Sequence, residues 1–376
     1  MDVSRRTPFS GRISGAILLA AAMLMLTACG SDTAPTERFY TMDDYPSVEK
    51  IDIHVHWHTA DTAFMAVARE DNFRLLTINT DYGDFPPIAE QLDLASAHHQ
   101  AYPERLAFAS TFPMSGWDDA GWEAKTIDHL DRTIAEGAVA VKVWKNIGMG
   151  FKDADGENVM IDDPGFDPVF DHIRDRGVVL IGHQGEPKNC WLPLEEMTVN
   201  NDRGYFKNHP QYHMYLHPEE PSYETHMQVR DRMLAKNPEL RFMGAHLASL
   251  EWSVDSLAAF LDRYPNAVVD MAARMGQVQY QSSQDREKVR QFLIDYQDRV
   301  LYATDLTVGP DDDPATFRAQ AHKKWMEDWQ YLTTDDTMTV PELDGEFQGL
   351  KLPADVVDKI YHVNARKFYP GSFGQS

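Results

Sequence analysis

The chain has 376 residues, of which 43% are hydrophobic and 25% charged, and its formal net charge at pH 7 is −24. This composition is typical of a globular protein with a sizeable core, and the length suits one large domain. The acidic balance argues against nucleic acid as a partner, because phosphate binding needs clustered Lys and Arg.

The first 28 residues have the composition of a signal peptide. Arg5, Arg6 and Arg12 form a basic start, and residues 17–26 are an apolar run too short to cross a bilayer comfortably. We therefore expect residues 1–28 to be removed from the mature protein.

The apolar run ends in Leu-Thr-Ala-Cys, which resembles the bacterial lipobox. In that motif the cysteine, here Cys29, is lipidated; the alternative is an ordinary signal peptide with an incidental cysteine. We expect a lipid-anchored protein of the bacterial cell envelope, with residues 29–46 as a flexible tether rich in Ser, Thr, Asp and Pro. Residues 47–371 would form the folded domain, in which Cys190 has no disulfide partner.

Eight short runs rich in β-branched residues alternate with helical patterns. The runs are 50–56, 74–80, 106–112, 138–144, 178–183, 241–246, 267–271 and 300–304. Helical periodicity is found at 88–102, 122–136, 166–176, 223–236, 250–263 and 285–296. Alternating strands and helices favour a parallel sheet, and eight such units predict a closed (β/α)8 TIM barrel of the α/β class.

Two connections are unusually long, and both follow a predicted strand. They are residues 185–222, after the fifth strand, and 308–350, after the eighth. Barrel enzymes place their active sites at the carboxyl ends of the strands, so these loops would be lids or pocket walls. Packing between subunits of a homo-oligomer is the alternative.

The first run contains two histidines that can share one metal ion. Because alternate side chains of a strand share a face, His54 and His56 would point together into the barrel mouth, and Ile53 and Val55 toward the helices. Two imidazoles so placed can chelate a divalent ion. A His-x-His pair alone is weak evidence, and its position on the first strand strengthens it.

Later strands end in further metal-binding or catalytic residue types. His183 ends the fifth run, His246 the sixth, and Asp305 directly follows the eighth. Each residue taken alone could have a purely structural role, as a buried hydrogen-bonded histidine or a helix cap. Together, however, they lie where barrel enzymes place catalytic groups.

These motifs resemble the amidohydrolase superfamily and, within it, the amidohydrolase-2 family of hydrolases and non-oxidative decarboxylases. The matching segments are Asp52-Ile53-His54-Val55-His56, Gly137-Ala138-Val139-Ala140-Val141-Lys142, Ile181-Gly182-His183, Gly244-Ala245-His246-Leu247, Tyr302-Ala303-Thr304-Asp305 and Asn364-Ala365. The resemblance covers residues 50–368. It is specific for the superfamily and says little about the substrate.

The resemblance implies a metal site made by His54, His56, His183 and Asp305. The cofactor would be a divalent metal, with zinc first and manganese, iron or nickel as alternatives. His246 and Asp305 would be the catalytic residues: His246 orients or deprotonates the nucleophile, or polarises the departing group, and Asp305 takes a proton from metal-activated water.

Lys142 and Arg274 are candidates with open roles. Lys142 shares strand parity with Ala138 and Ala140 and would point inward, as a carboxylated bridge between two metals, a substrate-binding cation or a structural lysine. Arg274 follows the seventh run and would clamp a substrate carboxylate or make an ordinary salt bridge. His58 would line the pocket, and Trp57, Trp144 and Trp191 would either line it or pack in the core.

The leading hypothesis is hydrolysis of an amide, ester or lactone bond in a small-molecule substrate. A non-oxidative decarboxylase on the same metal site is the first alternative, because both reactions use all of these motifs. A lipid-anchored binding protein without activity is the second alternative, and the full set of ligand types speaks against it.

Overall fold

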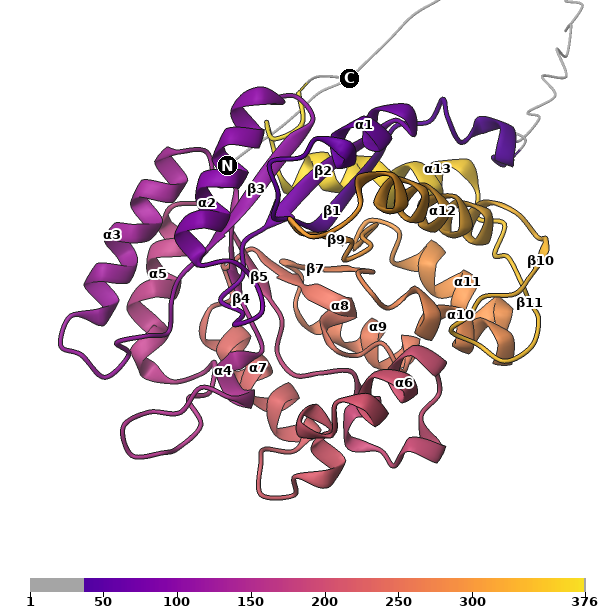
Figure 1. Ribbon diagram of the computed structural model, residues 1–376. Helices are drawn as coiled ribbons and strands as arrows, with labels where there is room; N and C mark the ends of the chain where they lie inside the picture. The colour runs from indigo at the N-terminus through magenta and orange to yellow at the C-terminus, as the bar shows by residue number, and fades with distance from the viewer. Residues whose placement is uncertain (1–36, 375–376) are drawn as a thin grey trace, which may run out of the picture. The chain divides into compact units, whose positions relative to one another are not determined.

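A computed structural model describes residues 37–374, and Figure 1 shows its strands surrounded by helices. The predicted (β/α)8 barrel is confirmed: within these residues nine parallel strands form one sheet, in the order β8-β7-β6-β5-β4-β3-β2-β1-β9. The strands are β1 (Lys50–Trp57), β2 (Phe73–Ile78), β3 (Leu106–Thr111), β4 (Ala140–Val143), β5 (Val179–Gly182), β6 (Phe242–Gly244), β7 (Ala267–Asp270), β8 (Val300–Leu301) and β9 (Thr307–Val308).

Helices follow the strands, and several begin at side chains that accept a hydrogen bond from the first turn. Such caps are Ser222, Ser253, Asp285 and Asp313. The α-helices are α1 (Ala63–Glu70), α2 (Ile88–Ala101), α3 (Trp122–Ala135), α4 (Asn146–Met149), α5 (Asp167–Asp175), α6 (Asn200–Asn208), α7 (Tyr223–Lys236), α8 (Ala245–Ala248), α9 (Val254–Arg263), α10 (Met275–Gln284), α11 (Arg286–Asp295), α12 (Pro314–Thr333), α13 (Ala354–Asp358) and α14 (Asn364–Phe368).

The barrel closes between the first and last strands. β8, at the start of the eighth run, pairs with β7, whereas β9, which lies beyond the end of that run, pairs with β1. In the gap, the amide of Asp305 donates to the carbonyl of His54 at 2.8 Å, and the amide of His56 donates to the carbonyl of Leu306 at 2.8 Å. Closure therefore brings Asp305 against the two histidines of β1.

Two apolar layers hold the barrel. Alternate strand residues fill its interior, where Ile51, Ile181 and Leu301 are fully buried. The intervening residues, such as Val141 and Leu180, pack outward against the helices. The interior is thus a packed core below the mouth, as the fold requires.

β1 contains a bulge that changes which side chains face inward. Its register against β2 advances three residues, from Asp52 to Val55, while β2 advances two, from Leu75 to Thr77. The predicted orientation of Ile53 toward the helices is wrong, because Ile53 packs in the barrel interior. The extra residue lets Ile53 and His54, adjacent in sequence, both face inward. Val55 faces the helices, as expected.

The two long connections contain more regular structure than loops. Residues 185–222 include α6 and four short 3-10 helices. Residues 308–350 include the 20-residue helix α12 and the antiparallel pair of β10 (Thr337–Met338) and β11 (Phe347–Gln348). Three large side chains of α12, Trp325, Trp329 and Tyr331, are fully buried. The buried face of α12 also includes the polar residues Asp328 and Thr333, so the apolar periodicity of the segment is weak.

Part of the predicted tether packs on the barrel. Within residues 37–46, Tyr40 and Tyr45 are buried, and the Tyr40 hydroxyl donates to Asp358 at 2.8 Å. The predicted signal peptide and Cys29 lie outside the described residues. Between residues 37 and 374, no helix combines the length and the apolar character needed to cross a membrane.

Candidate metal centre

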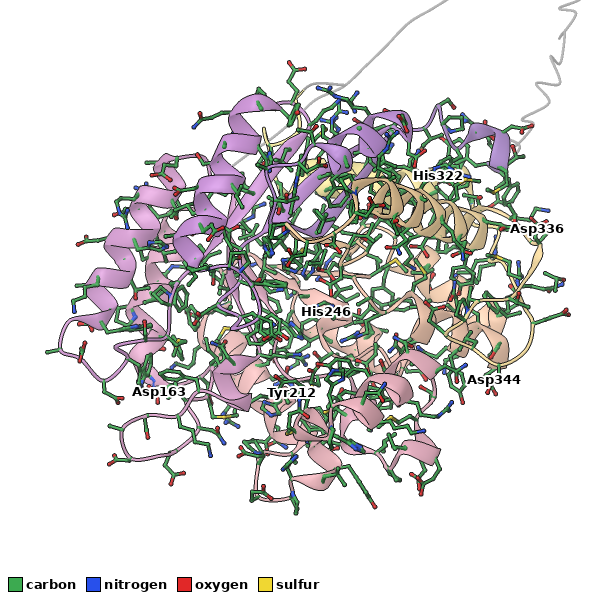
Figure 2. The ribbon with its side chains drawn as sticks, viewed as in Figure 1. Asp163, Tyr212, His246, His322, Asp336 and Asp344 are labelled. Carbon is green, nitrogen blue, oxygen red and sulfur yellow. The ribbon has the colours of Figure 1, made fainter. Side chains whose placement is uncertain are left out.

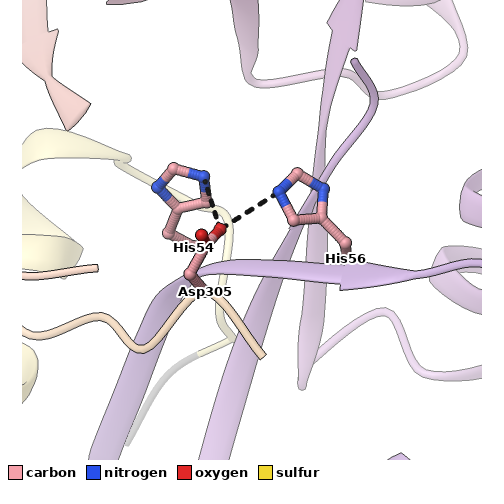
Figure 3. A group of neighbouring side chains, drawn as sticks. All are labelled: His54, His56 and Asp305. Carbon is pink, nitrogen blue, oxygen red and sulfur yellow. Dashed lines mark ion pairs between the residues drawn. The ribbon is translucent and has the colours of Figure 1, made fainter. Parts of the chain in front are cut away.

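His54, His56 and Asp305 meet at the barrel mouth. The Nε2 atoms of His54 and His56 lie 3.4 and 3.3 Å from Oδ1 of Asp305, as Figure 3 shows by dashed lines. Both histidines are buried, and the Asp305 side chain is 30% exposed. One potential ligand atom from each residue lies within 4.8 Å of the others, a spacing at which a single ion could be held.

Hydrogen bonds on the far side of each ring set its tautomer. Nδ1 of His54 lies 2.8 Å from Oδ2 of Asp270, and Nδ1 of His56 lies 2.7 Å from the carbonyl oxygen of Ile78. Both partners are acceptors, so each Nδ1 carries the proton and each Nε2 presents a lone pair to the site. Outer hydrogen bonds of this kind orient histidine ligands in metalloproteins.

The donor set fits a divalent cation. Two Nε2 lone pairs and a carboxylate oxygen face one another, and none of these three atoms carries a proton. Such a group of electron-rich atoms would be stabilised by a cation between them. Imidazole nitrogens with one carboxylate suit zinc and also accept manganese, iron or nickel.

His183 and His246 stand together beside this group. Their ring centroids are 4.2 Å apart, and that of His246 is 4.9 Å from the His54 ring. Nε2 of His183 is buried and has no hydrogen-bond partner among residues 37–374. A buried ring nitrogen without a partner is costly, so this atom also fits a metal ligand. His183 nevertheless lies outside the compact group of His54, His56 and Asp305.

His246 belongs to an unusual backbone segment. Four consecutive residues, from His246 to Ser249, have φ between 54° and 58°. Ala273 and Asp305, which follow β7 and β8, have φ of 53° and 70°. Left-handed conformations are unfavourable for residues other than glycine and cluster at functional sites. Strain is therefore concentrated where three strands meet the site.

Asp270 organises the site, and sequence reasoning missed it. This fully buried carboxylate ends β7; Oδ2 accepts the His54 Nδ1 proton, and Oδ1 accepts the backbone amides of His246 and Ala272 at 2.7 and 3.1 Å. Burial alone would raise its pKa, but His54 holds the pKa below the usual value. The signal was an acidic residue after Val268 and Val269, in the middle of an apolar run.

Asp52 plays a similar part on the opposite face of β1. Its Oδ2 accepts hydrogen bonds from the Thr304 hydroxyl at 2.6 Å and from Nε1 of Trp325 at 3.0 Å. Its Oδ1 accepts the amide of Thr304 at 3.1 Å. Asp52 thus fixes the residue next to Asp305 and joins β1 to α12.

Burial sets the charge states at the mouth. It lowers the pKa of His54 and lowers the pKa values of His183 and His246 well below the ordinary value, which keeps these rings neutral. For Asp305, burial acts in the opposite direction, but His246, His56 and His54 hold its pKa well below the usual range. The site therefore presents neutral imidazoles and an ionised carboxylate, the protonation states that metal ligation needs.

Lys142 points inward, as expected from its strand. It is buried, and its Nζ lies 3.4 Å from Nε2 of His54. Ala140 also packs in the interior, whereas Ala138 packs with Leu92 and Ala95 on the helix side, because β4 begins only at Ala140. Burial lowers the Lys142 pKa to about 8.

Arg274 and most of the aromatic candidates stand apart from the cavity. Arg274 is buried, donates from Nη1 to the carbonyl of Ala273 at 3.0 Å, and has an Nε without a partner in the described part of the chain. Trp57 stacks on His98, and Trp191 packs between Tyr223 and His226.

A cavity of about 150 Å³ opens above the histidines. Figure 2 places His246 near the middle of the barrel. His58 lies beside this cavity against Phe85, with ring centroids 4.4 Å apart. The cavity is lined by His54, His56, Thr80, Tyr82, Phe85, Lys142, Trp144, Lys145, His183, His246, Asp305 and Thr307.

Comparisons with known proteins agree with this architecture. The amidohydrolase-2 family model, described as an amidohydrolase, matches residues 51–371. The search of curated proteins found no match.

Solved structures with similar folds have low sequence identity. The 2,6-dihydroxybenzoate decarboxylase from Rhizobium is 15% identical, with 86% of this chain and 98% of that chain covered and a TM-score of 0.48. The 4-oxalomesaconate hydratase from Rhodopseudomonas palustris is 15% identical, with 86% and 96% covered and a TM-score of 0.46. A D-hydantoinase from Thermus sp. is 13% identical, with 69% and 57% covered and a TM-score of 0.40.

Proposed function

Since the chain belongs to the amidohydrolase family, we propose that it is a metal-dependent hydrolase of an amide, ester or lactone bond in a small molecule. The observation that carries the proposal is the convergence of two Nε2 lone pairs, from His54 and His56, on the ionised carboxylate of Asp305. His183 would complete the ligand set, because its buried Nε2 has no partner within residues 37–374.

The proposed roles follow from the protonation states. A divalent cation, when bound, supplies Lewis acidity that polarises a carbonyl group and makes water easier to deprotonate. Asp305 accepts the proton of the attacking water and returns it to the leaving group. Nδ1 of His246 donates to the carbonyl of Ala272 at 2.8 Å, so its Nε2 accepts a hydrogen bond and orients the water.

Metal content of the purified protein tests the site. After purification without chelators, we expect mass spectrometry to find about one divalent ion per chain, zinc or one of the alternatives named above. The ion should be absent from His54→Ala. His322→Ala is the matched control, because this histidine lies on α12 with its side chain 48% exposed. A folded wild type that holds no metal and takes up no added zinc would contradict the proposal.

Decarboxylation is the second candidate, and Lys142 is the observation that favours it. A buried ammonium group beside the histidines would attract a substrate carboxylate. Product analysis separates the two reactions. Under the hydrolase proposal, esters, amides or lactones should release alcohol, amine or ring-opened acid. Release from an aromatic acid of CO₂ together with the arene that has a hydrogen in place of the carboxyl group, with no ester, amide or lactone cleaved, would support the decarboxylase instead.

The cellular location of the protein is a separate proposal, which depends on the sequence alone. We propose that Cys29 is lipidated and anchors the protein in the bacterial cell envelope, because it follows an apolar run in a lipobox-like ending. Metabolic labelling with a fatty acid should mark the wild type and not Cys29→Ala. Equal labelling of both chains would exclude this anchor.

A further inference from the structure

A second, larger cavity, the outer chamber, adjoins the cavity above the histidines, the inner chamber. The outer chamber has a volume of about 340 Å³, against about 150 Å³ for the inner one. Tyr82, Trp144 and Lys145 line both chambers and so form the boundary between them. The two chambers are therefore neighbours with three side chains in common.

The walls of the outer chamber carry flat aromatic and thioether side chains. The ring centroids of Tyr82 and Trp144 are 4.5 Å apart, and Tyr212, Met149 and Met214 complete this apolar part. Aromatic faces and methionine sulfur are favourable partners for another aromatic ring. These side chains come from different connections, after β2, β4 and β5.

The connection after β5 leaves some of its tyrosine side chains open to solvent. Tyr205 and Tyr212 are 39% and 40% exposed, and their rings are nearly parallel, at 7° with centroids 6.4 Å apart. Figure 2 labels Tyr212, which belongs to this connection. Large aromatic side chains exposed next to a cavity are typical of ligand recognition.

The boundary also carries an ion pair. Lys145 donates to Glu186, and its Nζ lies 5.3 Å from the centre of the Trp144 ring. Lysine has three N–H donors, so Lys145 retains donors for a ligand. A polar linking group that passes between the chambers would find a donor and an acceptor there.

We propose that the outer chamber binds an aryl group of the substrate, while the bond to be cleaved lies in the inner chamber. A cavity of about 150 Å³ holds one benzene-sized ring, so the inner chamber alone suits a single-ring compound. The substrate class is then an ester or amide whose acid part carries a second ring or a comparable flat group. This inference rests on the proposed hydrolase function for the chemistry, but not for the binding.

The test compares one-ring and two-ring acids, which are products of hydrolysis and not its substrates. Binding of benzoate and biphenyl-4-carboxylate to the purified protein is measured by titration calorimetry. We expect the two-ring acid to bind about tenfold more tightly, because its outer ring gains aromatic contacts. Tyr212→Ala and Met149→Ala, at two residues that line only the outer chamber, should each weaken it by about fivefold and change benzoate binding less than twofold.

Tyr215→Ala is the matched control, because this tyrosine is on the same connection, is 51% exposed and lines neither chamber. It should leave both affinities unchanged. Equal binding of the two acids, or equal losses for both acids in the variants, would overturn the proposal. If the protein hydrolyses no ester, amide or lactone but prefers the two-ring acid in a Tyr212-dependent way, the hydrolase function is rejected. The proposal that the outer chamber binds an aryl group is then still supported.

Discussion

Below the histidines, the barrel interior is filled by apolar side chains such as Ile51 and Ile181, and it contains few groups that need a partner. At the mouth of the same strands, backbone strain, buried charge and polar atoms without partners occur together. Packing at the lower end stabilises the fold. At the mouth, strained backbone and buried polar groups lower the stability, but they hold reactive groups in place. Four substitutions test this division, from the largest expected effect to the smallest.

Ile51→Ala should affect stability and leave the site intact. Removing this fully buried side chain from the interior costs about 2–5 kcal/mol, through lost burial and the cavity left behind. Chemical denaturation measures the loss, and metal content per folded chain should stay at the wild-type level. Metal loss in folded Ile51→Ala would show that the two ends are not independent.

Glu251 should make the mouth sensitive to pH. Burial raises the pKa of this carboxyl, which precedes α9, to about 7. The folded pKa therefore exceeds the unfolded one, so the contribution to stability is full below about pH 4.3 and is lost as pH rises through 7. The linked change is up to about 4 kcal/mol. Thermal unfolding between pH 4.5 and 7.5 should show a steeper decline in wild type than in Glu251→Gln, and parallel curves would refute the assignment.

Asp270→Asn should weaken metal binding more than it weakens the fold. The asparagine amide cannot accept all three hydrogen bonds that the carboxylate accepts, so the His54 tautomer is no longer fixed. Loss of such a partner lowers metal affinity by about 10–100-fold. Competition with a chromophoric chelator measures this change. Asp163→Asn, at the exposed cap of a 3-10 helix, is the control and should retain the wild-type affinity.

Ala248→Gly should stabilise the protein, unlike most substitutions of buried residues. Ala248 has φ of 54°, which glycine adopts without the penalty that a Cβ atom imposes. We expect a gain of about 1 kcal/mol in the free energy of unfolding. Ala321→Gly, a buried site within α12, should lose about the same amount. A loss at both sites would mean that the mouth stores no strain at Ala248.

The lower end of the barrel was the more predictable part. Each of the eight runs contains a strand, because Val, Ile and Leu repeated between helical patterns are a local signal. The helix α12 was missed since its burial depends on contacts with the N-terminal residues and β1, which periodicity does not encode.

The mouth was predictable only in its residue types. The structure brings His54, His56 and Asp305 together, with Lys142 and His246 beside them, while their roles in ligation and catalysis remain predictions. The rule that alternate residues of a strand face the same side gave the wrong orientation for Ile53, because a bulge depends on how the neighbouring strand pairs. Asp270 was missed because its importance lies in three hydrogen bonds, two of which join it to His54 and His246, residues that are close only in space.

The bulge in β1 also bears on how this site could change over time. Because one extra residue between Asp52 and Val55 brings the inward face forward to His54, chain length in this segment matters as much as side-chain identity. Loss of the Ile53 codon would restore simple alternation, with Asp52 still opposite Leu75, Val55 still opposite Thr77 and both histidines still facing inward. Loss of the next codon would instead remove His54 and leave Ile53 in its place, so two neighbouring one-codon deletions have opposite consequences for the candidate metal centre.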